Sequence, residues 1–337
     1  MGRTKIAFFS TPAKEKIFLR KRFDKNLFDV VFYNEPLDES TAHLIKDVDV
    51  VSVFIYSNIT KKVLEKAKRL KLIATRSTGF NHIDIKAAAK HKISVSNVPY
   101  YGENTVAEHT FALILALSRN IHKAYVRTTQ SNFSLDGLRG FDLKGKTLGV
   151  IGAGSIGVHV IKMAKGFSMN VLAFDAFQNH IVKELLDFDY VQLDELLSAS
   201  DIITLHCPYN EKTHHMINMK NIDKVKKGTI FINTARSGIV EPEALYYAVE
   251  KGIFSGAGLD VFDGEDLVNE ENQMLTKNVP IENLQAILKR NLLLRNENVI
   301  ITPHMAFDSV EAVERILETT VDNIKAFLEN RKYFKVV

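Results

Sequence analysis

The stretch TLGVIGAGSIG, residues Thr147–Gly157, decides the fold of the second half of this chain. A short apolar run over Leu148–Ile151 predicts a buried strand, and an apolar helical pattern continues from the glycine turn to Ala164. Strand, glycine turn and helix in this order are the setting of a dinucleotide-binding fingerprint. The start of such a helix offers unpaired N–H groups and a partial positive charge to phosphates.

The three glycines of this turn have separate tasks. Gly152 allows the tight turn, Gly154 lets a pyrophosphate approach the backbone, and Gly157 lets the helix lie close to the strand. A second predicted strand ends in Asp175, close to the offset of about 20 residues expected for the acid that binds a ribose diol. A carboxylate there repels a 2′-phosphate, so NAD is predicted rather than NADP. An ordinary βαβ turn is the alternative interpretation.

Length and composition limit the class of protein. A chain of 337 residues exceeds the usual size of one core, so two domains are expected. The net charge of +4 comes from scattered Lys and Arg residues, which argues against a nucleic-acid partner. No apolar run is long enough to span a membrane. One cysteine, Cys207, and the lack of a signal-peptide pattern favour the cytoplasm.

Strand and helix patterns alternate along the whole chain, which predicts an α/β fold with two doubly wound parallel sheets. Residues 5–96 have the rhythm of a small parallel sheet, and a helix from about 309 to 328 is expected to return to it. Further helical segments are predicted at 221–226 and 281–294. A nearly all-apolar helix from Thr105 to Leu117 must be buried, and a partner subunit is one way to cover it.

Three strands after the fingerprint are followed by residues that a buried strand does not need. They are Arg236, Glu265 and His304. Carboxyl ends of parallel strands meet at one edge of a sheet, so the three side chains are expected to converge. Arginine grips a carboxylate in a planar fork, histidine exchanges a proton near neutral pH, and a glutamate favours the protonated imidazole. Alternatively, each is a separate surface residue on a loop.

Other polar positions carry weaker signals. The turn at 76–81 exposes consecutive N–H groups suited to an anion, although a plain strand-to-helix turn is the favoured interpretation of this loop taken alone. Two adjacent tyrosines at 100 and 101 suggest a substrate lid. Glu108 and His109, inside the apolar helix, are expected to make structural hydrogen bonds rather than to catalyse. His206 and the pair at 214–215 lack metal-ligand spacing, so no metal is expected.

Taken together, these motifs resemble the D-isomer-specific 2-hydroxyacid dehydrogenases, and within that family the D-lactate dehydrogenase branch. The resemblance covers nearly the whole chain. The stretches that carry it are residues 75–84, 98–101, 106–110, 152–157, 205–208, 214–218, 233–238, 258–262 and 301–304.

The resemblance implies roles for particular residues. It implies that the catalytic set is Arg236, Glu265 and His304. It implies a carboxylate loop and pocket formed by Ser77, Thr78, Gly79, Tyr101 and Phe307. For NAD it implies Ser155, Ile156, Asp175, His206, Cys207, Pro208, Thr213, Thr234, Ala235 and Asp260, beside the three glycines of the turn.

The resemblance also implies an architecture and an activity. A Rossmann NAD domain (102–302) would be inserted into a flavodoxin-like substrate domain (1–101 and 303–337), and the protein would be a homodimer. The implied reaction reduces pyruvate to D-lactate with NADH. Tyr100 and Asp308 depart from the branch's usual pattern near the pocket, so a bulkier 2-hydroxy acid stays an alternative. Formate or phosphite oxidation and an NAD-sensing dimeric binding protein are further alternatives.

Overall fold

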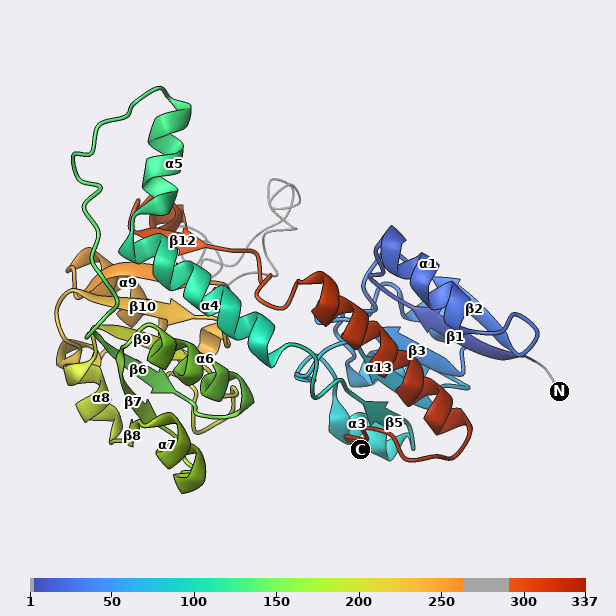
Figure 1. The fold of residues 1–337 in the computed structure, drawn as a ribbon. Coiled ribbons are helices and arrows are strands. Elements are labelled where there is room, and N and C mark those ends of the chain that lie inside the picture. The colour runs from blue at the N-terminus through green and yellow to red at the C-terminus, as the bar shows by residue number, and fades with distance from the viewer. Residues whose placement is uncertain (1–2, 263–290) are drawn as a thin grey trace. The chain divides into compact units, whose positions relative to one another are not determined.

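The computed structural model describes residues 3–262 and 291–337. The chain divides into two units (Figure 1). Unit 1 contains Met1–Tyr101 and Ser309–Val337, and unit 2 contains Gly102–Asp308. Each unit is built around its own parallel β-sheet.

The sheet of unit 1 has five parallel strands in the order β2-β1-β3-β4-β5. This is the flavodoxin-like order, in which the chain winds first to one side of β1 and then to the other. Strands β3 and β4 are buried along their whole length, as their mostly apolar sequences require. The strands are β1 (Thr4–Phe8), β2 (Phe28–Phe32), β3 (Val50–Val53), β4 (Leu72–Thr75) and β5 (Ser94–Ser96).

Helices cover both faces of this sheet. On one face α1 (Ala13–Arg22) and the returning α13 (Val310–Leu328) pack against Ile6 and Phe8 of β1. On the other face lie the 3₁₀ helix η1 (Ala42–Ile45), α2 (Lys61–Lys66) and α3 (Ile85–Lys90).

Short polar residues start three of these helices. Thr60, Asp84 and Ser309 each accept a hydrogen bond from the backbone N–H of the third residue after them. The chain end then returns to the sheet edge, where the N–H of Val336 donates to the carbonyl of Val95.

The sheet of unit 2 has seven parallel strands in the order β12-β11-β10-β9-β6-β7-β8. The crossover from one side of β6 to the other is that of the dinucleotide-binding fold. The strands are β6 (Thr147–Ile151), β7 (Asn170–Phe174), β8 (Asp189–Tyr190), β9 (Ile202–Leu205), β10 (Thr229–Asn233), β11 (Phe254–Leu259) and β12 (Val299–Ile301).

Apolar cores lie on both faces of this sheet. Helices α4 (Glu103–Ser118) and α6 (Ser155–Gly166) share one core with β6 and β10. Helices α8 (Leu193–Ala199) and α9 (Pro242–Glu250) share the other with β9 and β11. The unit also contains α5 (Ile121–Thr129), α7 (His180–Leu186) and the 3₁₀ helices η2 (Ile222–Lys224) and η3 (Ser237–Ile239).

The predicted fold class is confirmed, and several details differ. The chain returns to unit 1 at Ser309 rather than at residue 303, because the Asp260 carboxylate binds the N–H groups of Met305 and Ala306 and keeps them in unit 2. The segment 221–226 forms only the single turn η2. Helix α4 is covered largely by its own unit, so its apolarity needs no partner subunit. Most of the helix predicted at 281–294 lies outside the described residues.

Candidate active site

The glycine turn after β6 has the geometry that a dinucleotide requires. Gly152 has φ +97°, a left-handed conformation that favours glycine, and a Cβ there would collide with the backbone at His206 and Cys207. A Cβ on Gly157 would overlap the carbonyl oxygen of Gly152. By contrast, a Cβ on Gly154 would meet no atom within 4 Å. The backbone is therefore closely packed on two sides and open at Gly154.

The open side faces the start of α6, which begins at Ser155. Gly154 is the N-cap of this helix and supplies no side-chain hydrogen bond to its first turn. The first N–H groups of a helix need partners from outside it, and phosphate oxygens suit them. The turn and helix start therefore fit the pyrophosphate of NAD, with Ser155 and Ile156 at the first two helical positions.

Asp175 follows β7 and is tied to the glycine turn. Its Oδ2 accepts the N–H of Ala153 at 2.7 Å, and its Oδ1 accepts the N–H of Phe177 at 2.8 Å. The half-buried carboxylate thus lies next to the turn. This is the position from which a carboxylate can bind a ribose diol.

The loop after β9 borders the same turn. The N–H of His206 donates to the carbonyl of Ile151 at 2.7 Å, and its buried ring bonds the Thr204 hydroxyl through Nε2 at 2.9 Å. Its Nδ1 is buried and has no hydrogen-bond partner among the described residues. Burial lowers the pKa of His206 to about 3, so the ring is neutral.

Cys207 and Pro208 complete this loop. Burial raises the pKa of the Cys207 thiol to about 11, which makes it a packed, unreactive group. The Thr213 hydroxyl donates to the carbonyl of Pro208 at 2.7 Å and accepts the N–H of Asn210 at 2.8 Å, and these bonds fix the loop's shape. Among the described residues, no group of acidic, histidine or cysteine side chains could hold a metal ion.

The loop after β10 carries Arg236. The buried Asn233 side chain accepts the N–H of Ala235 and donates to the carbonyl of Arg236, both at 3.0 Å. The Thr234 hydroxyl pairs with that of Thr110 on α4 at 3.0 Å. The half-buried Arg236 donates through Nη1 to the carbonyl of Ala235 at 2.6 Å. A guanidinium has five N–H donors, so this bond orients it and leaves donors for an anionic substrate.

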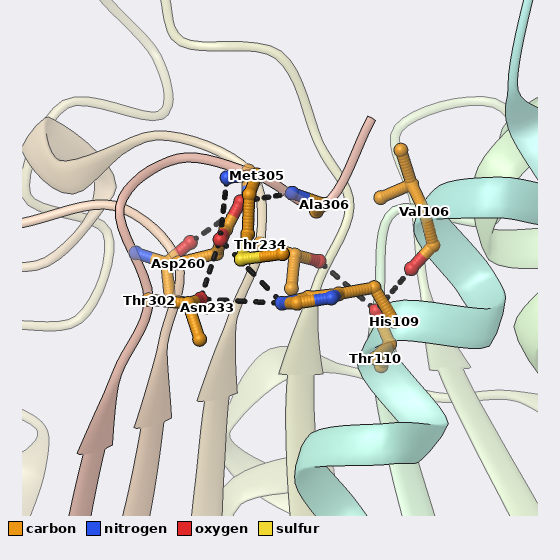
Figure 2. Close-up of polar contacts among 10 residues, drawn as sticks. Val106, His109, Thr110, Asn233, Thr234, Asp260, Thr302, Met305 and Ala306 are labelled. Atoms are coloured by element: carbon orange, nitrogen blue, oxygen red, sulfur yellow. Dashed lines mark hydrogen bonds and ion pairs between the residues drawn. The ribbon is translucent and has the colours of Figure 1, made fainter. Parts of the chain in front are cut away.

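The turn after β12 carries His304 and wraps around Asp260, the fully buried residue that follows β11 (Figure 2). Asp260 accepts the N–H of Met305 at Oδ1 and that of Ala306 at Oδ2, each at 2.9 Å. Its carbonyl accepts the N–H of His304 at 3.0 Å. His304 itself adopts φ +54°, a conformation that an L-residue rarely keeps without support.

Two more side chains reach the Asp260 carboxylate. The Thr302 hydroxyl donates to Oδ1, and His109 Nε2 lies 3.2 Å from that hydroxyl and 3.5 Å from Oδ1 (Figure 2). Burial alone would raise the pKa of Asp260, but the bonds from His109, Thr302 and the backbone lower it overall. Asp260 is therefore an ionised anchor for the turn that carries His304.

Arg236 and His304 thus follow β10 and β12, which both pair with β11. Glu265, the third residue of the predicted catalytic set, lies outside the described residues. Phe307 is half-buried and belongs to unit 2.

The predicted carboxylate loop lies in unit 1, directly after β4. The carbonyls of Ser77, Thr78 and Gly79 accept hydrogen bonds from Val98 N–H, Asn97 Nδ2 and the Ser77 hydroxyl. In a trans peptide the N–H points opposite to the preceding carbonyl, so the N–H groups that follow these carbonyls point away from those donors. Tyr101 ends the unit, and its carbonyl accepts a bond from Arg315 Nε on α13.

Sequence reasoning missed Arg76, which precedes this loop. Its fully buried guanidinium donates to the Ser52 hydroxyl and to the carbonyls of Phe9 and Ser10. Burial lowers its pKa to about 10, against the opposing effect of Glu15. It fastens the loop to the ends of β1 and β3. The missed signal was a charged residue directly after a fully buried strand.

Comparisons with known proteins place the chain in a family. Residues 111–306 match the model of the D-isomer specific 2-hydroxyacid dehydrogenase NAD binding domain. D-lactate dehydrogenase of Escherichia coli is 36% identical over 325 residues, 95% of each chain. An aromatic 2-oxoacid reductase of Clostridium sporogenes is 40% identical over 294 residues, covering 86% of this chain and 85% of the relative.

A solved structure agrees with these sequence matches. The structure of D-lactate dehydrogenase from Aquifex aeolicus, complexed with NAD and lactic acid, has a TM-score of 0.87 at 39% identity and covers 96% of both chains. The fold and site define an NAD-dependent oxidoreductase. The chain belongs to the D-isomer specific 2-hydroxyacid dehydrogenases. Among the described helices, none is both long and apolar enough to cross a membrane.

Proposed function

We propose that this protein catalyses reversible hydride transfer between NADH and a small 2-oxo acid, with pyruvate as the first substrate and D-lactate as the product. The observation that carries the proposal is the placement of Arg236 and His304 in turns after two strands that flank β11, in the unit that holds the glycine turn. An anion-gripping arginine and a proton-exchanging histidine are the groups that reduction of a 2-oxo acid needs.

In the proposed reaction each residue has one task. Arg236 binds the substrate carboxylate and polarises the ketone, and we expect the N–H groups of Thr78 and Gly79 to bind the same carboxylate. His304 gives its proton to the oxygen on C2 as that atom gains negative charge. Glu265 favours the protonated form of His304. NADH, when bound, supplies the hydride. General acid catalysis of this kind contributes roughly 10²–10⁴-fold.

Several residues are proposed to hold the cofactor. The glycine turn and the start of α6 bind the pyrophosphate, and Asp175 binds the ribose. Asp260 and the loops after β9 and β10 complete the cofactor site. The residues of those two loops are His206, Cys207, Pro208, Thr213, Thr234 and Ala235.

The assembly and location are also proposals. We expect a homodimer, which is supported by exposed apolar side chains on α5 and the following loop: Tyr125 is 70%, Phe133 77% and Leu135 83% exposed. Size-exclusion chromatography with light scattering tests this, and a monomer at micromolar concentration contradicts it. We expect the protein in the cytoplasm, since a single cysteine cannot form an intrachain disulfide.

A bulkier 2-oxo acid is the second candidate substrate. The aromatic 2-oxoacid reductase is 40% identical to this chain, and Tyr100 and Asp308 lie at the positions where the sequence departs from the D-lactate pattern. The two candidates differ only in the side chain that the pocket accepts.

The test follows the absorbance of NADH with purified protein and separate 2-oxo acids: pyruvate, hydroxypyruvate, glyoxylate, 2-oxoisocaproate and phenylpyruvate. The highest kcat/KM with pyruvate, and reversal with D-lactate but not L-lactate, supports the proposal. A preference for phenylpyruvate or 2-oxoisocaproate transfers the assignment to the second candidate. NADH binding without turnover of any acid contradicts both and favours an NAD-sensing protein.

A further inference from the structure

Helix α4 contacts both loops that carry the proposed catalytic residues. Thr110 pairs with Thr234, two residues before Arg236. His109, the preceding residue of the helix, pairs with Thr302, two residues before His304. Adjacent helix residues thus contact the ends of β10 and β12, on either side of β11 (Figure 2).

We propose that the His109–Thr110 pair of α4 is a positioning device that sets the spacing between Arg236 and His304. The inference rests on the proposed function, because it assigns a task toward those two residues. Neither His109 nor Thr110 is assigned a direct part in the reaction.

The His109 side of the device works through hydrogen bonds that run in one direction. The Thr302 hydroxyl donates to Asp260, so it must accept from His109, and this requires a proton on Nε2. Asp260 in turn accepts the N–H groups of Met305 and Ala306 and, at its carbonyl, that of His304. His109 therefore lies at the outer end of the network that holds the left-handed turn.

On the Thr110 side of the device, fewer hydrogen bonds separate the helix from the loop. Its fully buried hydroxyl donates to the carbonyl of Val106 at 2.9 Å, so it accepts the Thr234 hydroxyl proton at 3.0 Å. This bond fixes the first residue of the loop after β10. Asn233 fixes the next part by binding at Ala235 and Arg236.

The polar side chains of His109 and Thr110 are not needed for the packing of α4. A buried helix that only fills space uses apolar residues, yet α4 turns a fully buried threonine and a histidine with a side chain only 17% exposed toward the carboxyl ends of the strands. Each residue places one polar atom against a loop: His109 Nε2 contacts Thr302, and Thr110 Oγ1 contacts Thr234. Displacing a reacting group by about 1 Å can cost about 10²-fold in rate, so such a brace has consequences for catalysis.

The two sides predict different kinetic effects. His109→Leu releases the turn of His304, so kcat with the best 2-oxo acid should fall about 10- to 100-fold with a smaller change in KM. Thr110→Val keeps the volume but removes the hydroxyl that pairs with Thr234, two residues before Arg236, so KM for the 2-oxo acid should rise about 5- to 10-fold. His109→Gln and Thr110→Ser retain a donor and an acceptor and should restore most of each loss.

Matched controls separate positioning from stability. His122→Leu removes bonds to the carbonyls of Ala116 and Glu297, and Ser118→Ala removes a buried hydroxyl at the far end of α4. Both should lower the melting temperature as much as the test variants do and leave kcat and KM unchanged. Kinetic losses in the controls equal to those in the test variants would contradict the proposal.

Hydrogen exchange tests the same network without turnover. The amides of Met305 and Ala306 donate to Asp260, so a peptide spanning 302–307 should exchange at least about tenfold faster in His109→Leu than in His109→Gln or in the wild type. Unchanged exchange and unchanged kinetics overturn the inference. A wild type that turns over no 2-oxo acid refutes the proposed function alone, since the exchange measurement still reports on the brace.

Discussion

The carboxylate of Asp175, at the end of β7, accepts the backbone N–H of Ala153 in the glycine turn at 2.7 Å. The residue predicted to bind the ribose is therefore hydrogen-bonded to the turn predicted to bind the pyrophosphate, 22 residues earlier in the chain. The bond places a negative charge beside the turn, where a 2′-phosphate would be repelled.

Neutralising this charge should weaken the preference for NADH. In Asp175→Asn we expect the Kd for NADH to rise about 10-fold or more, because a hydrogen bond to a charged group contributes about 1.5–3 kcal/mol. The Kd for NADPH should change less or fall. Fluorescence titration measures both. Asp187→Asn, at an exposed residue paired with Lys165, is the control and should bind like the wild type. An unaltered NADH to NADPH ratio in Asp175→Asn would refute this role.

The glycines of the fingerprint should separate cofactor binding from folding. Gly154→Val adds a side chain in open space, so the melting temperature should stay close to that of the wild type while NADH binding falls at least about 10-fold. Gly157→Ala would collide with the carbonyl of Gly152 and should lose about 1–3 kcal/mol of stability.

A third glycine supplies the control for these substitutions. Gly166 ends α6 and has open space around its Cβ position, so Gly166→Ala should be neutral or stabilising by up to about 1 kcal/mol. Thermal unfolding and NADH titration of the three variants test the prediction. Normal NADH binding by Gly154→Val would show that no phosphate approaches the backbone there.

His304 should affect the chemical step and not cofactor affinity. His304→Gln cannot give up a proton, so kcat should fall roughly 10²–10⁴-fold. NADH titration should give a Kd within about twofold of the wild type. His122→Gln is the control, since that histidine bonds the carbonyls of Ala116 and Glu297 and has no part in the proposed site. Substantial turnover by His304→Gln would rule out its role as the proton donor.

The neutral, buried His206 should make stability depend on pH. Its pKa is about 3 in the folded protein and 6.5 in the unfolded chain, so between these values the unfolded chain alone binds the proton. The contribution of His206 to the free energy of unfolding is therefore complete above pH 6.5. It is lost as the pH falls below that value, by about 1.4 kcal/mol per pH unit. Denaturant unfolding of the apoprotein from pH 7 to pH 4.5 measures it.

The comparison variant isolates this single group. His206→Gln does not titrate, so the stability difference between wild type and variant should shrink or reverse as the pH falls. His180→Gln, at an exposed histidine, should follow the wild type in parallel. If the plots of unfolding free energy against pH are parallel for all three proteins, His206 takes up a proton in the folded state and the prediction is wrong.

Local pattern was enough to predict the two parallel sheets, because strands buried on both faces form continuous apolar runs. It also placed Arg236 and His304 in the loops after β10 and β12, three residues past the end of each strand. The prediction of a helix at 221–226 was wrong. The segment has only two apolar residues to bury, and it forms a single 3₁₀ turn. Helices α3, α5 and α7 were not predicted. Helices α3 and α7 have only six and seven residues, less than two helical turns, and α5 buries none of its residues.

The sequence by itself determined the glycine turn with its acid, the α/β class and the residue types available for chemistry, because each depends on neighbours within one strand–turn–helix unit. Only the tertiary structure decided what holds those residues in place. His109 reaches Thr302 across 193 positions, and Thr110 reaches Thr234 across 124. These partners meet because the crossovers of the sheet bring β10, β11 and β12 together beside α4, and no local periodicity records the order of strands in a sheet.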